Sequence, residues 1–324
     1  MKKFIIYTFL FAFVATISFT GCKETETGEE AVAYETLTTY LKSESMDLSY
    51  VIGNKDAGTF FAMAAPADGD LSAKWIMDIR GDADFNAGHI TGAHQVAFSN
   101  ILTAAATADK PILVVCKTGQ TACYATTLLR LAGYPDTKAL KWGMSGWNAD
   151  LDKWSANCKD LTTETNWTTD ATAAESFSAP SFSSSALDGA SLLQERVAAV
   201  VAAGFKTASN ADVLANPGNY YINNFFSASH YEGFGHVKGA VRVNPLSIDE
   251  CDKLDPNGKV VTYCYTGQTS AIVTAYLNVL GFDAYSLLFG VNGMTTTNSF
   301  WETGGVTNHW GYDSNPKSLT YETN

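Results

Sequence analysis

The sequence is short of basic residues. Lysine and arginine together number 21 in 324 residues, against 33 aspartates and glutamates, so the formal net charge is −12. Surfaces that bind DNA or RNA carry clustered lysine and arginine, and we therefore expect no nucleic-acid partner. The chain is 46% hydrophobic and 17% charged, which suffices for ordinary globular cores, and its length fits two domains.

Metal-ligand patterns are also missing. The five histidines, the cysteines and the carboxylates form no group with the spacing of metal ligands, so we expect no metal and no other cofactor.

The N-terminus carries an apolar run, Phe4 to Phe19, directly after two lysines. The run is shorter than a membrane-spanning helix and ends in small residues, which is typical of a secretory signal. Phe19-Thr20-Gly21-Cys22 resembles a bacterial lipobox, in which the cysteine is acylated and becomes the mature N-terminus. An ordinary signal peptide with an incidental Cys22 is the alternative.

We accordingly predict a lipoprotein signal peptide over 1–21 and a polar tether over 22–34, with Cys22 as the lipid anchor in the membrane of a bacterial cell envelope. Lys23 after the cysteine, rather than aspartate, favours the outer membrane in a Gram-negative cell. Cleavage would take the formal charge from −12 to −14, because Lys2 and Lys3 are lost.

Five cysteines remain in the mature chain, and an odd count in an exported protein indicates at least one free thiol. They are Cys116, Cys123, Cys158, Cys251 and Cys264. Cys158 and Cys251 could pair, which the sequence does not decide. Cys123 is interpreted as a core residue two helical turns, about 10 Å, beyond Cys116.

The chain repeats itself. Three segments recur in the same order, displaced by 147 or 148 residues: Gly88–Ala93 as Gly235–Ala240, Pro111–Thr121 as Lys259–Thr269, and Trp142–Gly146 as Phe289–Gly293. The repeat predicts a tandem duplication. We place domain 1 at 35–158, a linker rich in Ser and Thr at 159–186, and domain 2 at 187–324.

Each copy alternates strands and helices. Trp75–Ile79, Ile112–Val115, Tyr220–Asn224 and Val260–Tyr263 are predicted strands, and the continuous apolar runs among them indicate strands buried on both faces. A helix is predicted over Ser191–Ala203, and the helices after the two core strands should end near Gly133 and Gly281. The fold class is therefore α/β, with a mainly parallel sheet flanked by helices in each domain.

Cys116 and Cys264 each follow a core strand and precede a helix, at the sheet edge where α/β proteins bind ligands. A short glycine-containing loop and a helix N-terminus direct N–H groups inward, and such a cradle suits a thiolate or an oxyanion. We therefore predict two accessible thiols of lowered pKa.

The order D-x-R, G-H-[IV]-x-G-A, apolar strand, C-x-x-G-x-T, helix and closing W-G or F-G turn resembles the rhodanese family. The resemblance implies two tandem rhodanese-like domains that form a cysteine persulfide from a small anionic sulfur donor and pass it to a thiol or cyanide. It makes Cys116 and Cys264 the nucleophiles. The residues implied to hold the substrate are Lys117, Thr118, Gly119, Gln120 and Thr121, and Tyr265, Thr266, Gly267, Gln268 and Thr269.

The resemblance also implies structural residues near the site. Asp78 and Arg80 are similar to the family's buried ion pair, and His89 and His236 lie in its structural turn. The second copy aligns Asn224 and Phe226 with the pair. Since Lys117 is a cation beside the nucleophile and Tyr265 is not, the sequence predicts Cys116 to be the better acceptor from anionic donors.

Other functions remain to be weighed. A phosphatase of the C-x5-R kind needs an arginine six residues after the cysteine, where this chain has Ala122 and Ser270, so that activity is disfavoured. A binding module without turnover, serving a protein complex of the envelope, stays open, as does a carrier or reductase of sulfur-like oxyanions such as selenite. The thiol acceptor is not identified by the sequence.

Overall fold

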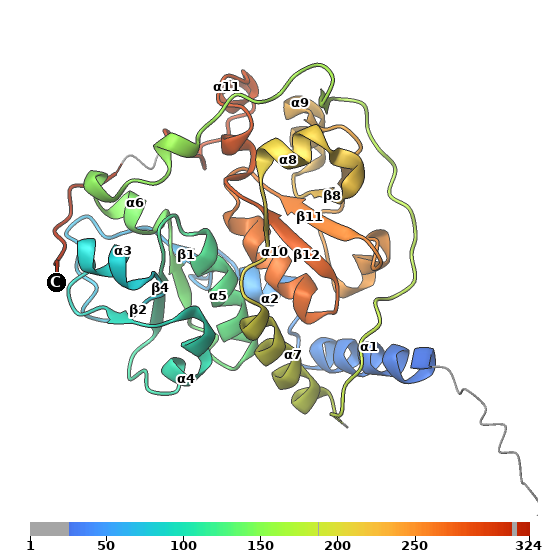
Figure 1. Cartoon of the computed structure of the whole chain (residues 1–324), viewed down its shortest axis with the longest axis horizontal. Coiled ribbons are helices and arrows are strands. Elements are labelled where there is room, and N and C mark those ends of the chain that lie inside the picture. Colours follow the sequence, from blue (N-terminus) through green and yellow to red (C-terminus); the bar gives the residue numbers. More distant parts are fainter. Residues whose placement is uncertain (1–25, 187, 313–315) are drawn as a thin grey trace, which may run out of the picture.

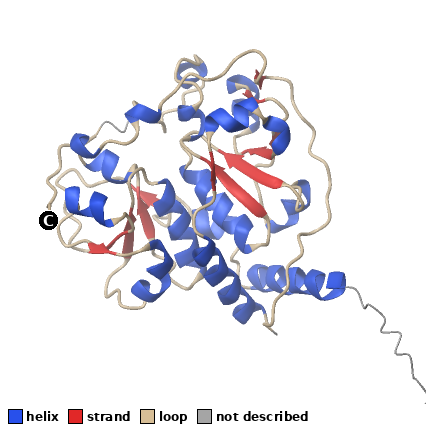
Figure 2. Cartoon of the chain, in the orientation of Figure 1, coloured by secondary structure: helices blue, strands red, loops and turns tan. Residues whose placement is uncertain are grey.

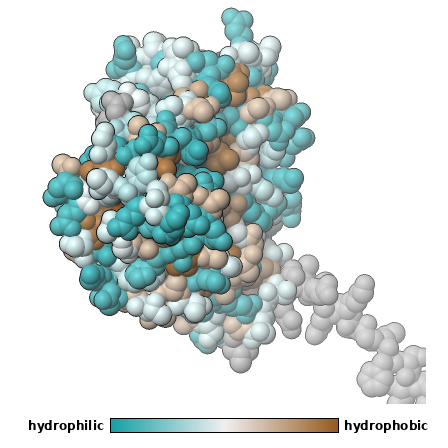
Figure 3. Space-filling model, turned by 60° about the vertical axis from the view of Figure 1, so that its left-hand side comes forward, coloured by the Kyte–Doolittle hydropathy of each residue, from teal (hydrophilic) through white to brown (hydrophobic). Residues whose placement is uncertain are grey.

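The computed structural model describes residues 26–186, 188–312 and 316–324. The predicted signal peptide and Cys22 lie outside the described residues. No helix within the described ranges is both long and apolar enough to cross a membrane. Hydrophilic and intermediate residues cover most of the face in Figure 3, and the apolar residues there form small groups.

Two five-stranded parallel sheets form the framework (Figures 1 and 2). The first has the order β1-β5-β4-β2-β3, and the second, read from its β7 edge, has the equivalent order β7-β12-β11-β8-β10. The first is built from Ala62–Met63 (β1), Trp75–Asp78 (β2), His94–Gln95 (β3), Ile112–Val115 (β4) and Lys138–Leu140 (β5). The second is built from Thr207–Ala208 (β7), Tyr221–Asn224 (β8), Val241–Arg242 (β10), Lys259–Tyr263 (β11) and Asp283–Leu287 (β12). The shared order confirms two copies of one α/β domain.

Helices cover both sheets (Figure 2). They are α1 (Glu26–Ser43), α2 (Leu48–Ile52), α3 (Asp82–Ala87), α4 (Ile101–Ala105), α5 (Gln120–Leu131), α6 (Gly143–Trp147), α7 (Gly189–Ala203), α8 (Asn210–Ala215), α9 (Ala228–Phe234), α10 (Gln268–Val279) and α11 (Phe300–Thr303). Short 3-10 helices span Phe98–Asn100, Ala149–Leu151, Ser155–Asn157, Pro217–Asn219, Ile248–Lys253 and Gly290–Gly293. The helix predicted over Ser191–Ala203 is confirmed as α7. Gly133 and Gly281 follow α5 and α10 closely, and both have positive φ, as predicted helix ends should.

The central strand β4 is buried on both faces. Because side chains alternate along a strand, Ile112 and Val114 enter the cluster that contains α5, while Leu113 and Val115 enter a second cluster with α6. This explains the continuous apolar run in the sequence.

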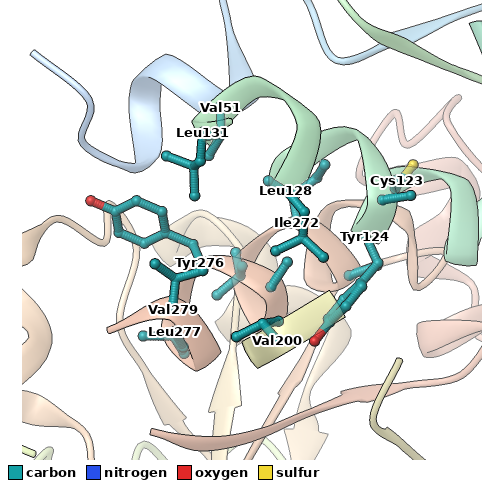
Figure 4. Close-up of a cluster of buried hydrophobic side chains, with 14 of the residues drawn as sticks. Val51, Cys123, Tyr124, Leu128, Leu131, Val200, Ile272, Tyr276, Leu277 and Val279 are labelled. Carbon is teal, nitrogen blue, oxygen red and sulfur yellow. The ribbon is translucent and has the colours of Figure 1, made fainter. Parts of the chain in front are cut away.

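Helices α5 and α10 join the two domains in one core. Leu128 and Leu131 of α5 and Ile272 and Val279 of α10 belong to the same buried cluster, and Figure 4 shows them facing one another. Val200 of α7 completes this layer. The carboxyl ends of β4 and β11, and the loops after them, are therefore held against each other by a shared apolar interface.

The chain segment after each domain packs on the other domain. Residues 159–172 run along domain 2, where Leu161 N donates to Met294 O at 2.7 Å and Trp167–Thr168 (β6) pairs antiparallel with His236–Val237 (β9). The final segment, 316–324, runs along domain 1, where Leu319 N donates to Trp147 O at 3.2 Å.

This exchange departs from the predicted division of the chain. The predicted domain 2 extends to residue 324, but 316–324 packs on domain 1, and the predicted linker contains a strand. The predicted tether over 22–34 is helical from Glu26, because Glu29, Glu30, Ala31 and Ala33 are good helix formers.

Candidate active site

Cys116 and Cys264 occupy equivalent positions. Each directly follows a central strand, β4 or β11, and three loop residues lead to the first residue of α5 or α10. The third loop residue is Gly119 in one copy, with φ of 85°, and Gly267 in the other, with φ of 75°. Both loops therefore need the left-handed conformation that glycine adopts without strain.

Backbone N–H groups point at both sulfur atoms. Cys116 Sγ accepts hydrogen bonds from Gly119 N at 3.1 Å and Ala122 N at 3.3 Å. Cys264 Sγ accepts one from Ser270 N at 3.4 Å. This cradle has two N–H donors in domain 1 and one in domain 2, and it can hold negative charge on sulfur. Ala122 and Ser270 lie one residue beyond the stretches 117–121 and 265–269 that the sequence assigned to substrate binding.

The W-G and F-G turns fasten these loops. Met144 N donates to Cys116 O at 2.9 Å, and Val291 N donates to Cys264 O at 3.1 Å. A Cβ at Gly143 would lie 2.2 Å from Cys116 O, and one at Gly290 would lie 2.2 Å from Cys264 O. Only glycine permits this approach, which explains why the dipeptide recurs in both copies.

Two serine hydroxyl groups lie near the cysteine of domain 2, at positions where domain 1 has the methyl groups of alanines. Cys264 Sγ lies 3.8 Å from Ser270 Oγ, which lies 2.9 Å from Ser286 Oγ. Strand register aligns Ser286 with Ala139, and the loop repeat aligns Ser270 with Ala122. Both serines are fully buried.

The structure contradicts the predicted accessibility of both thiols and the predicted low pKa of Cys116. Cys116 is 4% exposed and Cys264 is 3% exposed. Burial raises the pKa of the Cys116 thiol, and hydrogen bonds from the N–H groups of Ala122, Thr118 and Gly119 oppose that rise. The prediction considered only the N–H groups and the helix terminus, whereas desolvation is the larger effect.

Cys123 is a core residue, as predicted, but it does not lie two helical turns beyond Cys116. Helix α5 begins at Gln120 rather than at the cysteine, so Cys123 lies in the first helical turn, and its N–H donates to Gly119 O at 3.0 Å. Its thiol is fully buried, and its pKa is raised well above the usual value by burial and then by the charges of Cys116 and Cys264.

Asp78 and Arg80 form the predicted buried ion pair. Arg80 Nη2 donates to Asp78 Oδ2 at 2.6 Å and to Gly88 O at 2.7 Å. In the strand register Asp78 pairs with Val115 and Asn224 with Tyr263, so Asn224 occupies the position of Asp78. Asn224 Nδ2 donates to the Tyr263 hydroxyl at 2.9 Å, a neutral contact in place of the ion pair.

The two histidines stabilise turns, as predicted. His89 Nδ1 lies 3.0 Å from Phe85 O, and His236 Nε2 lies 3.0 Å from Asp170 O. Burial lowers the pKa of His236. Their side chains contact these turns and the exchanged segments rather than the cysteine loops.

The residue after each cysteine gives the two sites different character. Lys117 is exposed, and its Nζ lies 2.7 Å from Asp84 Oδ2. Tyr265 instead stacks on Phe226 with ring centroids 4.4 Å apart, and its hydroxyl contacts His230 Nδ1.

Cys116 lines a pocket of about 410 Å³. Domain 1 contributes Arg80, Lys117 and Thr121, and domain 2 contributes Leu288 and Phe289. In domain 2 the positions of Arg80 and Lys117 are filled by the stacked rings of Phe226 and Tyr265. The first site is therefore open on its own domain's side, and the second is covered by aromatic rings there.

Two glutamines that the sequence assigned to substrate binding also connect the two domains. Gln120 Oε1 accepts a hydrogen bond from Phe289 N at 2.7 Å, and Gln268 Nε2 donates to Thr118 O at 3.3 Å. Each glutamine thus reaches across the domain interface to the partner loop. The sequence shows that glutamine recurs at the same position of both copies. That these glutamines join the two domains is seen only in the interface.

Cys158 and Cys251 do not pair. Both are free thiols, Cys251 buried in the shared core and Cys158 half-buried beside a tryptophan cluster.

Comparison with known proteins identifies the family. Residues 63–150 and 225–296 match the rhodanese-like domain. Thiosulfate sulfurtransferase GlpE of Shewanella oneidensis is 36% identical over 75 residues, which are 22% of this chain and 74% of that protein. The protein of the same name from Pseudomonas fluorescens is 36% identical over 74 residues, which are 22% of this chain and 68% of that protein.

Among solved structures, a thiosulfate sulfurtransferase from Pseudomonas aeruginosa aligns with 84% of this chain and 48% of its own, at 15% identity and a TM-score of 0.28. The assignment rests on the two domain matches and on the sequence relatives. The chain belongs to the rhodanese-like sulfurtransferase family and carries two rhodanese-like domains in tandem.

Proposed function

We propose that the protein forms a persulfide on Cys116 and on Cys264 from thiosulfate or a similar sulfane-sulfur donor and transfers that sulfur to a thiol or to cyanide. The observation that carries the proposal is the direction of the backbone N–H groups toward both sulfur atoms, at 3.1 to 3.4 Å. Those groups stabilise a thiolate before the transfer and the anionic outer sulfur after it.

The reaction has two steps. The cysteine thiolate attacks the outer sulfur of thiosulfate, its S–S bond breaks, and sulfite leaves with the bonding electron pair. The enzyme then holds the persulfide Cys–S–S⁻, and the total charge of −3 is unchanged. An acceptor nucleophile next attacks the outer sulfur, and the cysteine thiolate is the leaving group. Thr121 and Thr269 offer hydroxyl groups near the end of each loop.

Sulfur transfer from thiosulfate to cyanide tests this function. We expect activity in the wild type, partial activity in Cys116→Ser and in Cys264→Ser, and none in the double variant. Cys123→Ser is the matched control, because Cys123 lies outside the cradle, and it should keep activity. A double variant that transfers sulfur as fast as the wild type would refute the proposal.

The burial of Cys116 and Cys264, which are 4% and 3% exposed, supports a second candidate, an envelope accessory module without turnover. In that case the wild type would be inactive in the same assay with every donor, although it is folded.

We also propose that Cys22 is the lipid-anchored N-terminus, on the evidence of the basic start, the apolar run and the Thr-Gly-Cys ending. Changing Cys22→Ala should move the protein from the detergent phase to the aqueous phase. A wild-type protein found in the aqueous phase would contradict this.

A further inference from the structure

The carbonyl oxygen of Thr118, in the loop after Cys116, accepts hydrogen bonds from two buried side chains. Trp154 Nε1 donates to it at 3.0 Å, and Gln268 Nε2 donates to it at 3.3 Å. Trp154 is 0% exposed and Gln268 is 3% exposed, so water has little access to either bond. Because Gln268 belongs to domain 2, the first cysteine loop is held from both domains.

This carbonyl belongs to the same peptide unit as the Gly119 N–H, which donates to Cys116 Sγ at 3.1 Å. A trans peptide is planar, so its C=O and N–H point in opposite directions. Holding the Thr118 oxygen on one side therefore directs the Gly119 N–H toward sulfur on the other. Hydrogen bonds in series also polarise one another, so donors to the carbonyl strengthen the N–H as a donor. The other N–H bonded to this sulfur, that of Ala122, is held within helix α5.

The corresponding side chains of the second copy form different bonds. The repeat aligns Trp154 with Trp301, whose Nε1 donates to Thr295 O at 3.0 Å. It aligns Gln268 with Gln120, whose Nε2 donates at 3.0 Å to a threonine hydroxyl of its own loop. The support of the loop carbonyl is therefore not repeated in domain 2.

The two sulfur atoms differ accordingly. In the part of the chain that the structure describes, no side chain donates to Thr266 O, which corresponds to Thr118 O. Among the same residues, the Gly267 N–H does not donate to Cys264 Sγ. The loop whose carbonyl has two donors thus has the additional N–H bond to sulfur, and the loop without those donors lacks it.

We propose that Gln268 and Trp154 are positioning residues for the Cys116 site, so that domain 2 contributes to the reactivity of the first cysteine. The two side chains hold the Thr118 carbonyl, and the Gly119 N–H thereby faces the sulfur and stabilises its negative charge. The inference rests on the proposed function and identifies two groups that support it at one of the two cysteines. Gln268 follows the second cysteine in sequence and acts at the first.

Alkylation of Cys116 by iodoacetamide, followed on its peptide by mass spectrometry from pH ~7 to pH ~9, tests the positioning without a sulfur donor. Gln268→Met and Trp154→Phe each remove one donor, and each should slow alkylation about fivefold at pH ~8 because less thiolate forms. A side chain that only packs the loop would have the opposite effect, since a loosened loop exposes the sulfur and accelerates alkylation at every pH. A rate equal to or above that of the wild type would overturn the role of the residue changed.

Two control variants match these changes. Tyr124→Phe removes another hydrogen bond between the domains, which Asn278 Nδ2 donates to the Tyr124 hydroxyl at 3.2 Å. Trp310→Phe alters the same tryptophan cluster at a ring whose Nε1 donates to Ser155 Oγ rather than to the loop. Both should change the alkylation rate of Cys116 by less than about twofold. Slowing in the controls equal to that in the two test variants would overturn the inference, because packing alone would then set the rate.

Sulfur loading separates this inference from the proposed function. With thiosulfate, persulfide formation on the Cys116 peptide should also slow about fivefold in Gln268→Met and in Trp154→Phe. Absence of persulfide in every protein, together with the expected alkylation rates, would contradict the proposed function and leave the positioning supported. Persulfide formed at equal rates in the wild type and both variants would contradict the positioning and leave the proposed function supported.

Discussion

The two cysteine loops share a backbone and differ in what surrounds it. Both have a left-handed glycine, N–H groups aimed at sulfur, and a closing turn bonded to the cysteine carbonyl. Around the first loop stand an ion pair, Asp78–Arg80, and an exposed lysine paired with Asp84. Around the second stand Asn224, Phe226 and Tyr265, with stacked aromatic rings in place of charges.

This comparison indicates that the N–H cradle around each sulfur depends on the backbone. The surrounding side chains determine how a reagent or substrate can reach that sulfur. The neutral Asn224 still accepts the Phe226 N–H at 2.9 Å, as Asp78 accepts the Arg80 N–H at 3.1 Å. The turn that follows the strand is therefore preserved without the charges.

The predicted advantage of Cys116 stays a prediction, but its reason changes. The positive charge of Lys117, which motivated the prediction, is offset by the carboxylate of Asp84, whose Oδ2 lies 2.7 Å from Lys117 Nζ. What favours Cys116 is the pocket that it lines, whereas the residue after Cys264 is Tyr265, whose ring stacks on Phe226.

The largest expected effect comes from breaking the ion pair of the first site. Arg80→Phe leaves the fully buried Asp78 carboxylate without its partner, and we expect a loss of about 3–5 kcal/mol in the free energy of unfolding. Asp78→Asn/Arg80→Phe imitates the second site and should recover at least about half of that loss. Urea denaturation measures both, and equal stabilities for the single and double variants would show that the pair is not what holds this site.

The pH dependence of Cys116 tests the balance between burial and N–H groups. Because burial raises its pKa, little thiolate is present at neutral pH, and the thiolate is the reactive form. The rate of iodoacetamide alkylation in Cys264→Ser should therefore rise about tenfold per pH unit from pH ~7 to pH ~9. A rate that is already level at pH ~7 would mean that the N–H groups outweigh burial.

Removing the aromatic cover should make the second site resemble the first. Tyr265→Ala takes away the ring that stacks on Phe226, and alkylation of Cys264 should accelerate about fivefold because access limits it. Lys117→Ala is the matched change at the first site. Since Lys117 is exposed, the alkylation rate of Cys116 should change by less than about twofold. Equal changes in rate at the two cysteines would show that the aromatic rings do not distinguish the second site from the first.

The smallest expected effect concerns the buried hydroxyl groups. Ser270→Ala removes an oxygen 3.8 Å from Cys264 Sγ, a long contact, and should slow alkylation of Cys264 at neutral pH about two- to threefold. Ala122→Ser places the same group beside Cys116 and should accelerate its alkylation by a similar factor. Changes in the same direction at both cysteines would contradict a hydroxyl–thiolate contact.

The repeat made the fold predictable. Two copies of strand, glycine loop and helix located both sheets and both cysteines, because local patterns and a duplicated order determine those features. The exchanged segments 159–172 and 316–324 could not be found in this way, since they are short, polar and stabilised by contacts with residues of the other domain.

The sequence identified the residues around the cysteines, but it did not predict the burial that raises the pKa of Cys116. The sequence places N–H groups around Cys116, but desolvation depends on how deeply α5 and α10 bury the loop, which is a property of the interface. The pairing of Lys117 with Asp84 likewise depends on a tertiary contact between residues far apart in sequence.

Mass spectrometry of the loop peptides after brief treatment with thiosulfate tests the central claim most directly. We expect the mass of one added sulfur on the Cys116 peptide and on the Cys264 peptide, earlier on the former, and none on peptides with Cys158 or Cys251. Thiosulfate that leaves both loop peptides unchanged, or adds sulfur only elsewhere, would contradict it.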